Sequence, residues 1–131
     1  MFENANNTKK QGDIGLGSAI AHFTKMGFTV CLPLTDSQDY DLVVEVNDKL
    51  NKVQIKTSSN KTAYNEIYTV GLRILGGNQS WNGVVKHFDN TKVDYLFILL
   101  SDGRKYFIPT SVIDNKSSIN VGGEKYKEFE V

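Results

Sequence analysis

The sequence has few of the features that mark secreted and membrane proteins. It has one cysteine, Cys31, so no disulfide can form within the chain. Because Cys31 lies in an apolar stretch (28–32), we expect its thiol to fill space in the core. No apolar run approaches the ~20 residues that a bilayer requires. The first seven residues are polar and lack the basic start and apolar core of a signal peptide. We therefore predict a cytoplasmic protein that does not enter a membrane.

The chain also lacks an excess of charge of either sign. Fifteen basic residues balance fifteen acidic ones, whereas most dedicated nucleic-acid binders are basic. The charges are nevertheless unevenly distributed, because segment 49–61 contains four lysines and no acid, while four acids crowd segment 36–45. A basic segment beside an acidic one suits a metal-dependent phosphodiesterase. A solvated hairpin of mixed charge explains the same pattern equally well.

One amphipathic helix is predicted near the N-terminus. Residues Thr8 to Gln11 have the spacing of a capping box, which starts the helix near Lys9. Gly27 is expected to end the helix after Met26. Apolar residues recur at helical spacing, at Leu16, Ala19, Ile20, Phe23 and Met26. The glycines of the first turns either weaken this helix or let another backbone approach it closely.

Several short apolar segments predict strands. They are 28–32, 40–46, 52–58, 66–75, 93–100 and 105–108, and a five-residue connection closes a hairpin between the second and third. Helical segments are expected at 84–88, 109–114 and 124–131, and a loop at 76–83. With 131 residues, 40% of them hydrophobic, the chain should form one domain (1–131). The pattern predicts an α+β fold with α/β/α-like layers, in which an N-terminal helix leads onto a mixed central β-sheet.

Two of these strands carry the residues with the most specific chemistry. Alternation places Gln54 and Lys56 on one face of their strand, and Asp41 begins the preceding strand, close enough to share a pocket with that face. An acid, an amide oxygen and a lysine at one sheet edge can hold a divalent cation against a phosphodiester. Taken singly, Asp41 is also explained as a strand-opening turn acid and Lys56 as a solvated strand lysine. Their joint placement favours a metal-dependent nuclease.

The order of these motifs resembles that of the PD-(D/E)XK nuclease superfamily. The resemblance centres on Tyr40-Asp41-Leu42-Val43-Val44 and Val53-Gln54-Ile55-Lys56-Thr57, and it extends from Lys10 to Pro109. It implies a restriction-endonuclease-like fold with an αβββ core, and hydrolysis of DNA phosphodiesters with Mg²⁺ or Mn²⁺. Gln54 stands where the family usually has Asp or Glu. This Gln-x-Lys variant is similar to that of homing endonucleases encoded in bacterial group I introns.

The resemblance also implies a role for each residue of the site. Asp41 corresponds to the metal-binding aspartate, and Lys56 to the lysine that positions or activates the attacking water. Gln54 and the backbone carbonyl of Ile55 would complete the ligands, and the metal would bind more weakly because an amide is uncharged. Asp13 stands where the superfamily often has a helix glutamate, although an acid also suits a helix N-terminus. Glu45, which has the same parity as Asp41 along its strand, is a further candidate ligand.

Candidate DNA contacts lie outside this group. Basic and amide side chains contact phosphates and base edges, and tryptophan stacks on exposed bases. The candidates are Lys49, Lys52, Lys61, Arg73, Gln79 and Trp81. Each is equally well explained as an ordinary surface or loop residue. The two histidines, His22 and His87, lack a second ligand at metal spacing, and the tyrosines at 64, 68, 95 and 106 are expected in strands, as core or interface residues.

The apolar run Leu96–Leu100 is too continuous for a strand with an exposed face. It predicts helices on both faces of its strand or coverage by a partner chain. Because a domain of this size cannot easily span a long DNA site, we expect a homodimer or homotetramer. The leading hypothesis is a site-specific, homing-type DNA endonuclease. The alternatives are a structure-selective Holliday-junction resolvase, a catalytically impaired domain that binds nucleic acid, and a solvated hairpin with no site.

Overall fold

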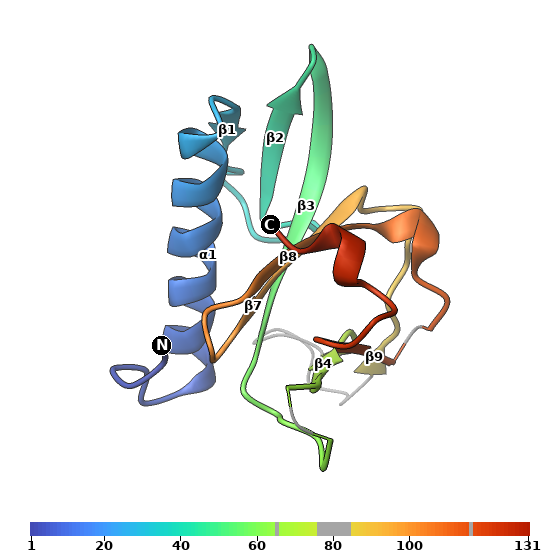
Figure 1. The fold of residues 1–131 in the computed structure, drawn as a ribbon. Helices are drawn as coiled ribbons and strands as arrows, with labels where there is room; N and C mark the ends of the chain where they lie inside the picture. Colours follow the sequence, from blue (N-terminus) through green and yellow to red (C-terminus); the bar gives the residue numbers. More distant parts are fainter. Residues whose placement is uncertain (65, 76–84, 116) are drawn as a thin grey trace.

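In the computed structural model, one long helix packs along a face of a five-stranded sheet (Figure 1). The structure describes residues 1–64, 66–75, 85–115 and 117–131. Helix α1 (Thr8–Lys25) is followed by the sheet, whose strands are ordered β1 (Thr29–Cys31), β2 (Leu42–Val46), β3 (Lys49–Ser58), β7 (Tyr95–Leu100) and β8 (Lys105–Pro109). Strands β3 and β7 are parallel and the other neighbours are antiparallel. This confirms the predicted mixed sheet behind an N-terminal helix.

Helix α1 follows its predicted course with a shift of one residue at its start. Asn7, rather than Thr8, caps the helix, because its side chain accepts a hydrogen bond from the Lys10 N–H (2.9 Å). At the other end Gly27 has a φ of 84°, the left-handed conformation with which helices often stop. The predicted apolar stripe faces the sheet and is centred on the fully buried Ala19 and Phe23. Met26 is 57% exposed, because it lies beyond the last helical turn.

Strands β2 and β3 are joined by a tighter turn than the sequence predicts. Asn47 and Asp48 both have positive φ, 52° and 63°, the combination found in a two-residue type I′ hairpin turn. Strand β3 therefore begins at Lys49. At the other end of the hairpin, pairing stops where Leu42 faces Val53. Within the described residues, the second half of β3 consequently has no strand paired to it on the β2 side.

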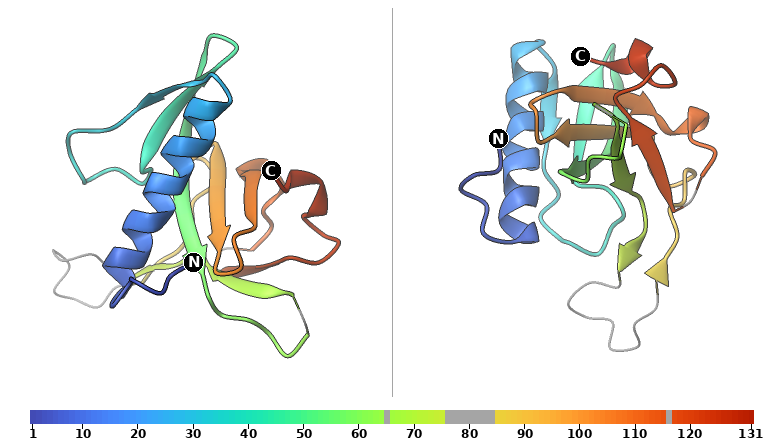
Figure 2. Two further views of the ribbon diagram at one scale, coloured as in Figure 1. Left: turned by 60° about the vertical axis from the view of Figure 1, so that its left-hand side comes forward. Right: turned by 60° about the horizontal axis from the view of Figure 1, so that its bottom comes forward.

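A small antiparallel ribbon, rather than a helix, covers the other face of the sheet. The ribbon consists of β4 (Tyr68–Gly71) and β9 (Ser118–Val121), and Figure 2 shows it across the sheet from α1. In β7, Leu96, Ile98 and Leu100 pack against this side, while Phe97 packs against α1. The continuous apolar run is thus buried on both faces within one chain. The expectation of helices on both faces, or of a partner chain, was wrong.

Several short elements also differ from the predictions. The single strand expected at 66–75 is divided into β4 and β5 (Ile74–Leu75). Strand β5 pairs with β6 (Val85–Lys86), which lies where a short helix was expected. The 3₁₀ helices η1 (Thr110–Val112) and η2 (Lys127–Phe129) fall within predicted helical segments. Cys31 is exposed rather than buried, because β1 is a short edge strand whose two end residues face solvent.

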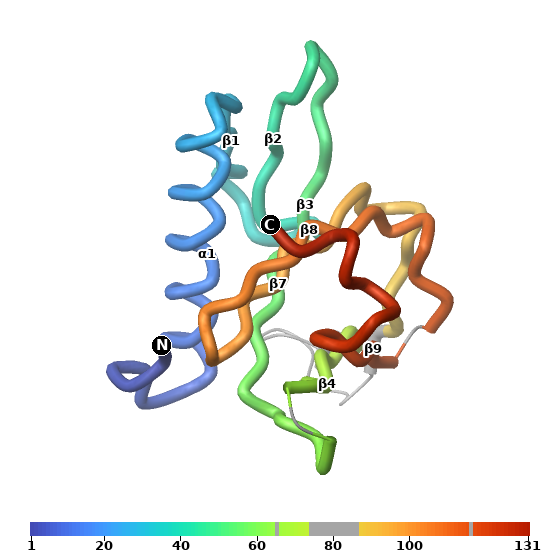
Figure 3. The backbone as a smooth tube through the Cα atoms, in the orientation of Figure 1, coloured from blue at the N-terminus to red at the C-terminus, as the bar shows by residue number. Residues whose placement is uncertain are grey.

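The C-terminal residues close the free edge of β8. Tyr106 pairs with Glu130, and the Val131 N–H donates to the Lys105 carbonyl (2.9 Å), as the path of the backbone shows (Figure 3). Within the described ranges, no helix is both long enough and apolar enough to cross a bilayer.

Helix α1 approaches β3 most closely at Gly15. A Cβ atom at this position would lie 2.6 Å from Thr57 Cγ2 and 3.2 Å from Ile55 Cγ2. Thr57 is β-branched, and its Oγ1 accepts a hydrogen bond from Gln11 Nε2 (2.9 Å). Its side chain therefore cannot turn away without losing that bond. Gly17 lies in the same helix, and its Cβ position has no neighbour within 4 Å in the described structure.

This difference predicts opposite effects for two alanine substitutions. We expect Gly15→Ala to lower the free energy of unfolding by roughly 1–3 kcal/mol, because the added methyl group overpacks the contact with β3. Gly17→Ala should raise it by up to about 1 kcal/mol, because alanine favours the helix and meets nothing. Urea unfolding of both variants checks this prediction. Stabilisation by both substitutions would contradict the close packing at Gly15.

Candidate active site

A cleft of about 790 Å³ lies between the N-terminal half of α1, the free end of β3 and the end of β4. Asp13 lines it from α1, and Asp41, which precedes β2, lines it beside Ile55 and Lys56 of β3. Arg73 lines it from the segment after β4. The fold therefore gathers in one cleft five of the residues singled out in the sequence, although they are spread over 61 positions of the chain.

Two hydrogen bonds hold Asp41 against the edge of β3. Its N–H donates to the Val53 carbonyl (2.9 Å), and its Oδ2 accepts from the Ile55 N–H (2.7 Å). The carboxylate thus occupies the edge position that a continued β2 would fill. Because the N–H and C=O of one strand residue point toward the same neighbouring strand, the Ile55 carbonyl also faces this edge. Asp41 and this carbonyl therefore offer oxygen atoms on the same side of β3.

Asp41 and Lys56 are partly removed from water, and each offsets the charge of the other. Burial raises the pKa of the Asp41 carboxyl, while the Ile55 N–H and the charge of Lys56 oppose the rise. Burial lowers the pKa of the Lys56 ammonium, and the charge of Asp41 opposes that change. Part of the Asp41 side chain reaches solvent, which moderates the effect on its pKa. A lysine with a lowered pKa beside an acid in a cleft suits proton transfer.

Gln54 lies on the same face of β3 as Lys56 but beneath the cleft. Its side chain is buried (6% exposed) and does not line the cleft wall. Its Oε1 has no hydrogen-bond partner among the described residues. An unpaired buried oxygen of this kind costs about 1–3 kcal/mol, and a cation bound next to Asp41 would supply its partner.

The donor atoms fit a hard divalent cation. A carboxylate, an amide oxygen and a backbone carbonyl are all oxygen ligands, which Mg²⁺ and Mn²⁺ prefer. Among the described residues, no three His, Cys, Asp or Glu side chains come close enough to hold a metal by themselves. Binding at this site would therefore depend on Gln54 and on the Ile55 carbonyl in addition to Asp41.

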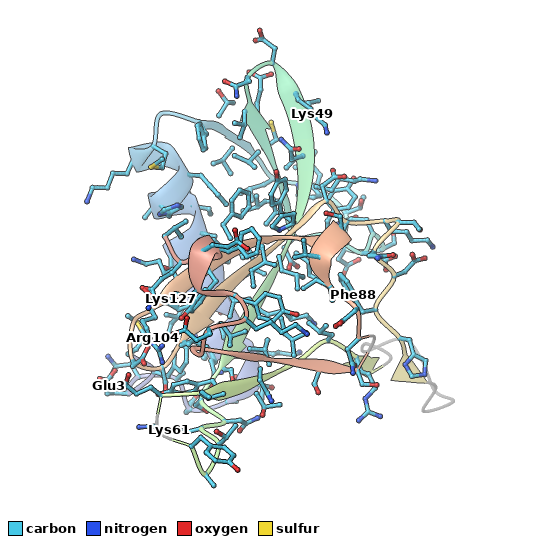
Figure 4. The ribbon with its side chains drawn as sticks, turned by 45° about the vertical axis from the view of Figure 1, so that its right-hand side comes forward. Glu3, Lys49, Lys61, Phe88, Arg104 and Lys127 are labelled. Atoms are coloured by element: carbon cyan, nitrogen blue, oxygen red, sulfur yellow. The ribbon has the colours of Figure 1, made fainter. Side chains whose placement is uncertain are left out.

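The other predicted residues lie in different places. Glu45 is four residues from Asp41 along the chain, about 13 Å at ~3.3 Å per residue, and it does not line the cleft. Lys49 and Lys61 lie at opposite ends of the molecule (Figure 4), so the lysines of segment 49–61 do not form one strip. Lys52 lines a separate surface pocket. Gln79 and Trp81 lie outside the described residues.

The histidines lie away from this cleft. The ring of His22 packs against Phe23 and Phe97. Burial, with a smaller contribution from the charge of Lys105, lowers the pKa of His22, which fits a structural role. His87 is exposed and does not line the cleft.

Two parts of the cleft wall were missed by reasoning from the sequence. Ser58 Oγ donates to the Thr69 carbonyl (2.5 Å) and accepts from the Asn60 N–H (3.1 Å), which ties β3 to β4 at the cleft. The polar run of residues 58–60, which begins with the last residue of the motif strand, was a signal for this wall. Gln11, which also lines the cleft, gave no such signal, because its place depends on how α1 packs on Thr57.

Known proteins resemble this chain in sequence and structure. A family model described as PD-(D/E)XK endonuclease matches residues 6–127. Among solved structures, the bacterial homing endonuclease I-Ssp6803I is similar, with 28% sequence identity and a TM-score of 0.73. That match covers 95% of this chain and 86% of the other. No curated protein matches the sequence. The structural match confirms the predicted restriction-endonuclease-like α+β fold.

The raised pKa of Asp41 predicts how stability depends on pH in the metal-free protein. Between the unfolded and the raised folded pKa, the folded state keeps a proton that the unfolded chain has released. The free energy of unfolding therefore falls as pH rises through this window, and it stays lowered above it. We expect Asp41→Asn to raise it by roughly 0.5–1 kcal/mol at neutral pH, a small effect because water screens a partly exposed group.

Urea unfolding in the presence of a chelator, over a series of pH values, measures this gain. It should vanish at a pH below both pKa values, where Asp41 is neutral in either state. Glu45→Gln replaces an exposed acid on β2 that does not line the cleft, and it serves as the matched control. A loss of stability for Asp41→Asn at neutral pH would contradict the desolvation of this carboxylate.

Proposed function

The chain belongs to the PD-(D/E)XK endonuclease family, and we propose that it cuts duplex DNA at specific sites in the presence of Mg²⁺ or Mn²⁺. The observation that carries this proposal is the Asp41 carboxylate, fixed on the free edge of β3 beside Lys56 in an open cleft. The likeness to a homing endonuclease and the Gln-x-Lys triplet support cleavage of the homing type. Residues 1–131 would act as one nuclease domain, in the cytoplasm where its DNA substrate lies.

The residues of the cleft would divide the work of hydrolysis. Asp41, Gln54 and the Ile55 carbonyl would hold the cation, and Asp13, which lines the same cleft, would be a further ligand. When bound, a divalent cation supplies charge that stabilises the phosphate in the transition state and acidifies a nearby water. Lys56 would orient the attacking water at its Nζ, and its lowered pKa increases the share of neutral amine that can accept a proton from that water.

DNA would cross the cleft with its backbone against the basic residues of the rim. Arg73 lines the cleft and Lys61 directly follows its Asn60 wall, so both would bind phosphates that flank the cut. Lys49 and Lys52 would contact more distant DNA, and Gln79 and Trp81 would contact bases. A homodimer or homotetramer would bring one cleft to each strand, because one cleft hydrolyses one phosphodiester at a time.

A cleavage assay with mapped DNA ends tests this function. The protein is incubated with supercoiled plasmid, linear bacterial DNA and a synthetic four-way junction, with Mg²⁺ or with chelator. We expect Mg²⁺-dependent cuts at discrete duplex sites, and linear plasmid without accumulation of nicked circles if two clefts act together. Asp41→Asn and Lys56→Met should each slow cleavage at least about 100-fold, because they remove charge and proton transfer at the phosphate.

Each other outcome of the cleavage assay would indicate a different function for this chain. Cuts confined to the four-way junction would identify a resolvase. Binding without cuts in Mg²⁺ and in Mn²⁺ would identify an impaired nuclease domain. Full activity of Asp41→Asn would contradict the assignment of the active site.

The amide of Gln54 predicts a weak metal site that one substitution strengthens. We expect Gln54→Glu to lower the Mg²⁺ concentration needed for half-maximal cleavage by about tenfold, since a carboxylate adds a charged ligand. Calorimetric titration with Mn²⁺ checks the same change without DNA. Gln54→Leu, which fills the space without an oxygen, is the matched control and should weaken Mn²⁺ binding. An unchanged metal requirement in both variants would exclude Gln54 as a ligand.

A further inference from the structure

A hydrogen-bonded loop leaves the cleft and presents an aromatic side chain to solvent. The loop, called here the tyrosine loop, consists of Ser59–Tyr64, Glu66 and Ile67, and it connects β3 to β4. Tyr64 is 76% exposed at its tip, although the sequence predicted this residue in a strand, as a core or interface residue. Single exposed aromatic side chains are common on protein surfaces. Tyr64 is notable for its place, because its loop begins in the cleft wall at Ser59 and Asn60, while Tyr64 itself lines a neighbouring hollow with Asp114 and Lys125.

Hydrogen bonds hold the loop in shape at its base and near its tip. At the base, the Thr69 N–H donates to the Asn60 carbonyl (2.9 Å), and Lys61 pairs with Tyr68. Nearer the tip, the Thr62 N–H donates to the Ile67 carbonyl (2.8 Å). Such a loop presents its side chains with little loss of entropy on binding.

Thr62 fixes the backbone of Tyr64 directly. Its Oγ1 donates to the Tyr64 carbonyl (3.0 Å) and lies 3.2 Å from the Tyr64 nitrogen, whose N–H donates to it. The Ile67 N–H donates to the same carbonyl (3.3 Å). The position of the Tyr64 ring therefore depends on a hydroxyl group that does not itself need to touch a ligand.

The position and charge of the loop suit duplex DNA. Its first residues, Ser59 and Asn60, line the cleft, and the loop extends from the same end of the molecule as the start of α1 (Figures 1 and 2). Lys61 is exposed and has no acidic partner among the described residues. The acid of the loop, Glu66, lies at Arg104, whose Nη2 donates to the Glu66 carbonyl (2.5 Å). Lys61 thus gives the loop a positive charge three residues before Tyr64.

We propose that the tyrosine loop is a DNA-contact element beside the cut site. Tyr64 packs its ring against the sugar and base edge of a nucleotide that flanks the scissile phosphate, and Lys61 binds a neighbouring phosphate. Thr62 is a positioning residue that holds Tyr64 for this contact. This proposal rests on the proposed endonuclease function. It adds to that function the residues that bind the duplex next to the cut.

The test measures binding of a fluorescein-labelled random-sequence duplex by anisotropy, in Ca²⁺ so that the DNA stays intact, over a series of salt concentrations. We expect Tyr64→Ala to weaken binding about tenfold, the order for one aromatic contact with nucleic acid, with an unchanged salt slope. Lys61→Gln should reduce that slope by about one, because one phosphate contact is lost. Tyr64→Phe should keep affinity within about twofold, because the ring makes the contact.

The variants at Thr62 separate positioning from contact. Thr62→Val should weaken binding about threefold, because the loop loses its internal hydrogen bonds, and Thr62→Ser should restore the affinity. Met26→Ala removes an exposed side chain from the C-terminal end of α1, away from the cleft, and should bind DNA normally.

Two failures are distinguishable in these measurements. If the unaltered protein neither binds nor cuts DNA, the endonuclease function itself fails. If it binds and cuts DNA while Tyr64→Ala does so equally well, the proposal for the loop is overturned. A Tyr64→Ala variant that binds DNA normally but changes mass in light scattering would instead place Tyr64 at an interface between copies of this chain, which also overturns the proposal.

Discussion

The hydrogen bond from the Ile55 N–H to Asp41 Oδ2 (2.7 Å) is the contact on which the site depends. It exists because β2 stops pairing at Leu42 and leaves the edge of β3 open from Ile55 onward. A carboxylate that accepts from that edge stands beside the carbonyl of the same residue. If β2 continued past Leu42, its backbone would pair with the edge of β3 at Ile55. The Ile55 carbonyl would then bond to that strand, and the Asp41 carboxylate would have no place at the edge. The end of one strand thus creates the site.

The cleft has its second wall because α1 can approach β3 closely. Gly15 leaves no side chain between the helix and Thr57, and Gln11 Nε2 donates to Thr57 Oγ1 one turn earlier. This packing brings Asp13 to the same cleft as Asp41 and Lys56. Burial raises the pKa of Asp41 and lowers that of Lys56. The charged forms of these two side chains therefore lower the free energy of unfolding, and the rest of the core offsets this cost. Such unfavourable charges are typical of sites selected for function.

The sequence predicted the parts of this molecule that depend on local pattern. The alternation in β3, the helical stripe of α1 and the glycine that ends it all follow from short periods and turn chemistry. The burial of Gln54 beneath the cleft and the exposure of Tyr64 depend instead on how distant segments pack. Likewise, β9 covers the sheet face that a helix was expected to cover, and its four residues carry no signal strong enough to predict a strand. Asp41, Gln54 and Lys56 were predicted from a motif whose meaning depends on the order of elements, and the fold has that order.

A crystal soaked in Mn²⁺ and measured at the manganese absorption edge would show whether a cation binds at Asp41 and the Ile55 carbonyl. We expect an anomalous peak at coordination distance from Asp41 Oδ and the Ile55 carbonyl, about 2.0–2.6 Å for oxygen ligands of a hard cation, with Gln54 Oε1 turned toward it. The peak should disappear in Asp41→Asn. A protein that cuts DNA in Mn²⁺ while its metal binds elsewhere would contradict the placement of the metal site at Asp41.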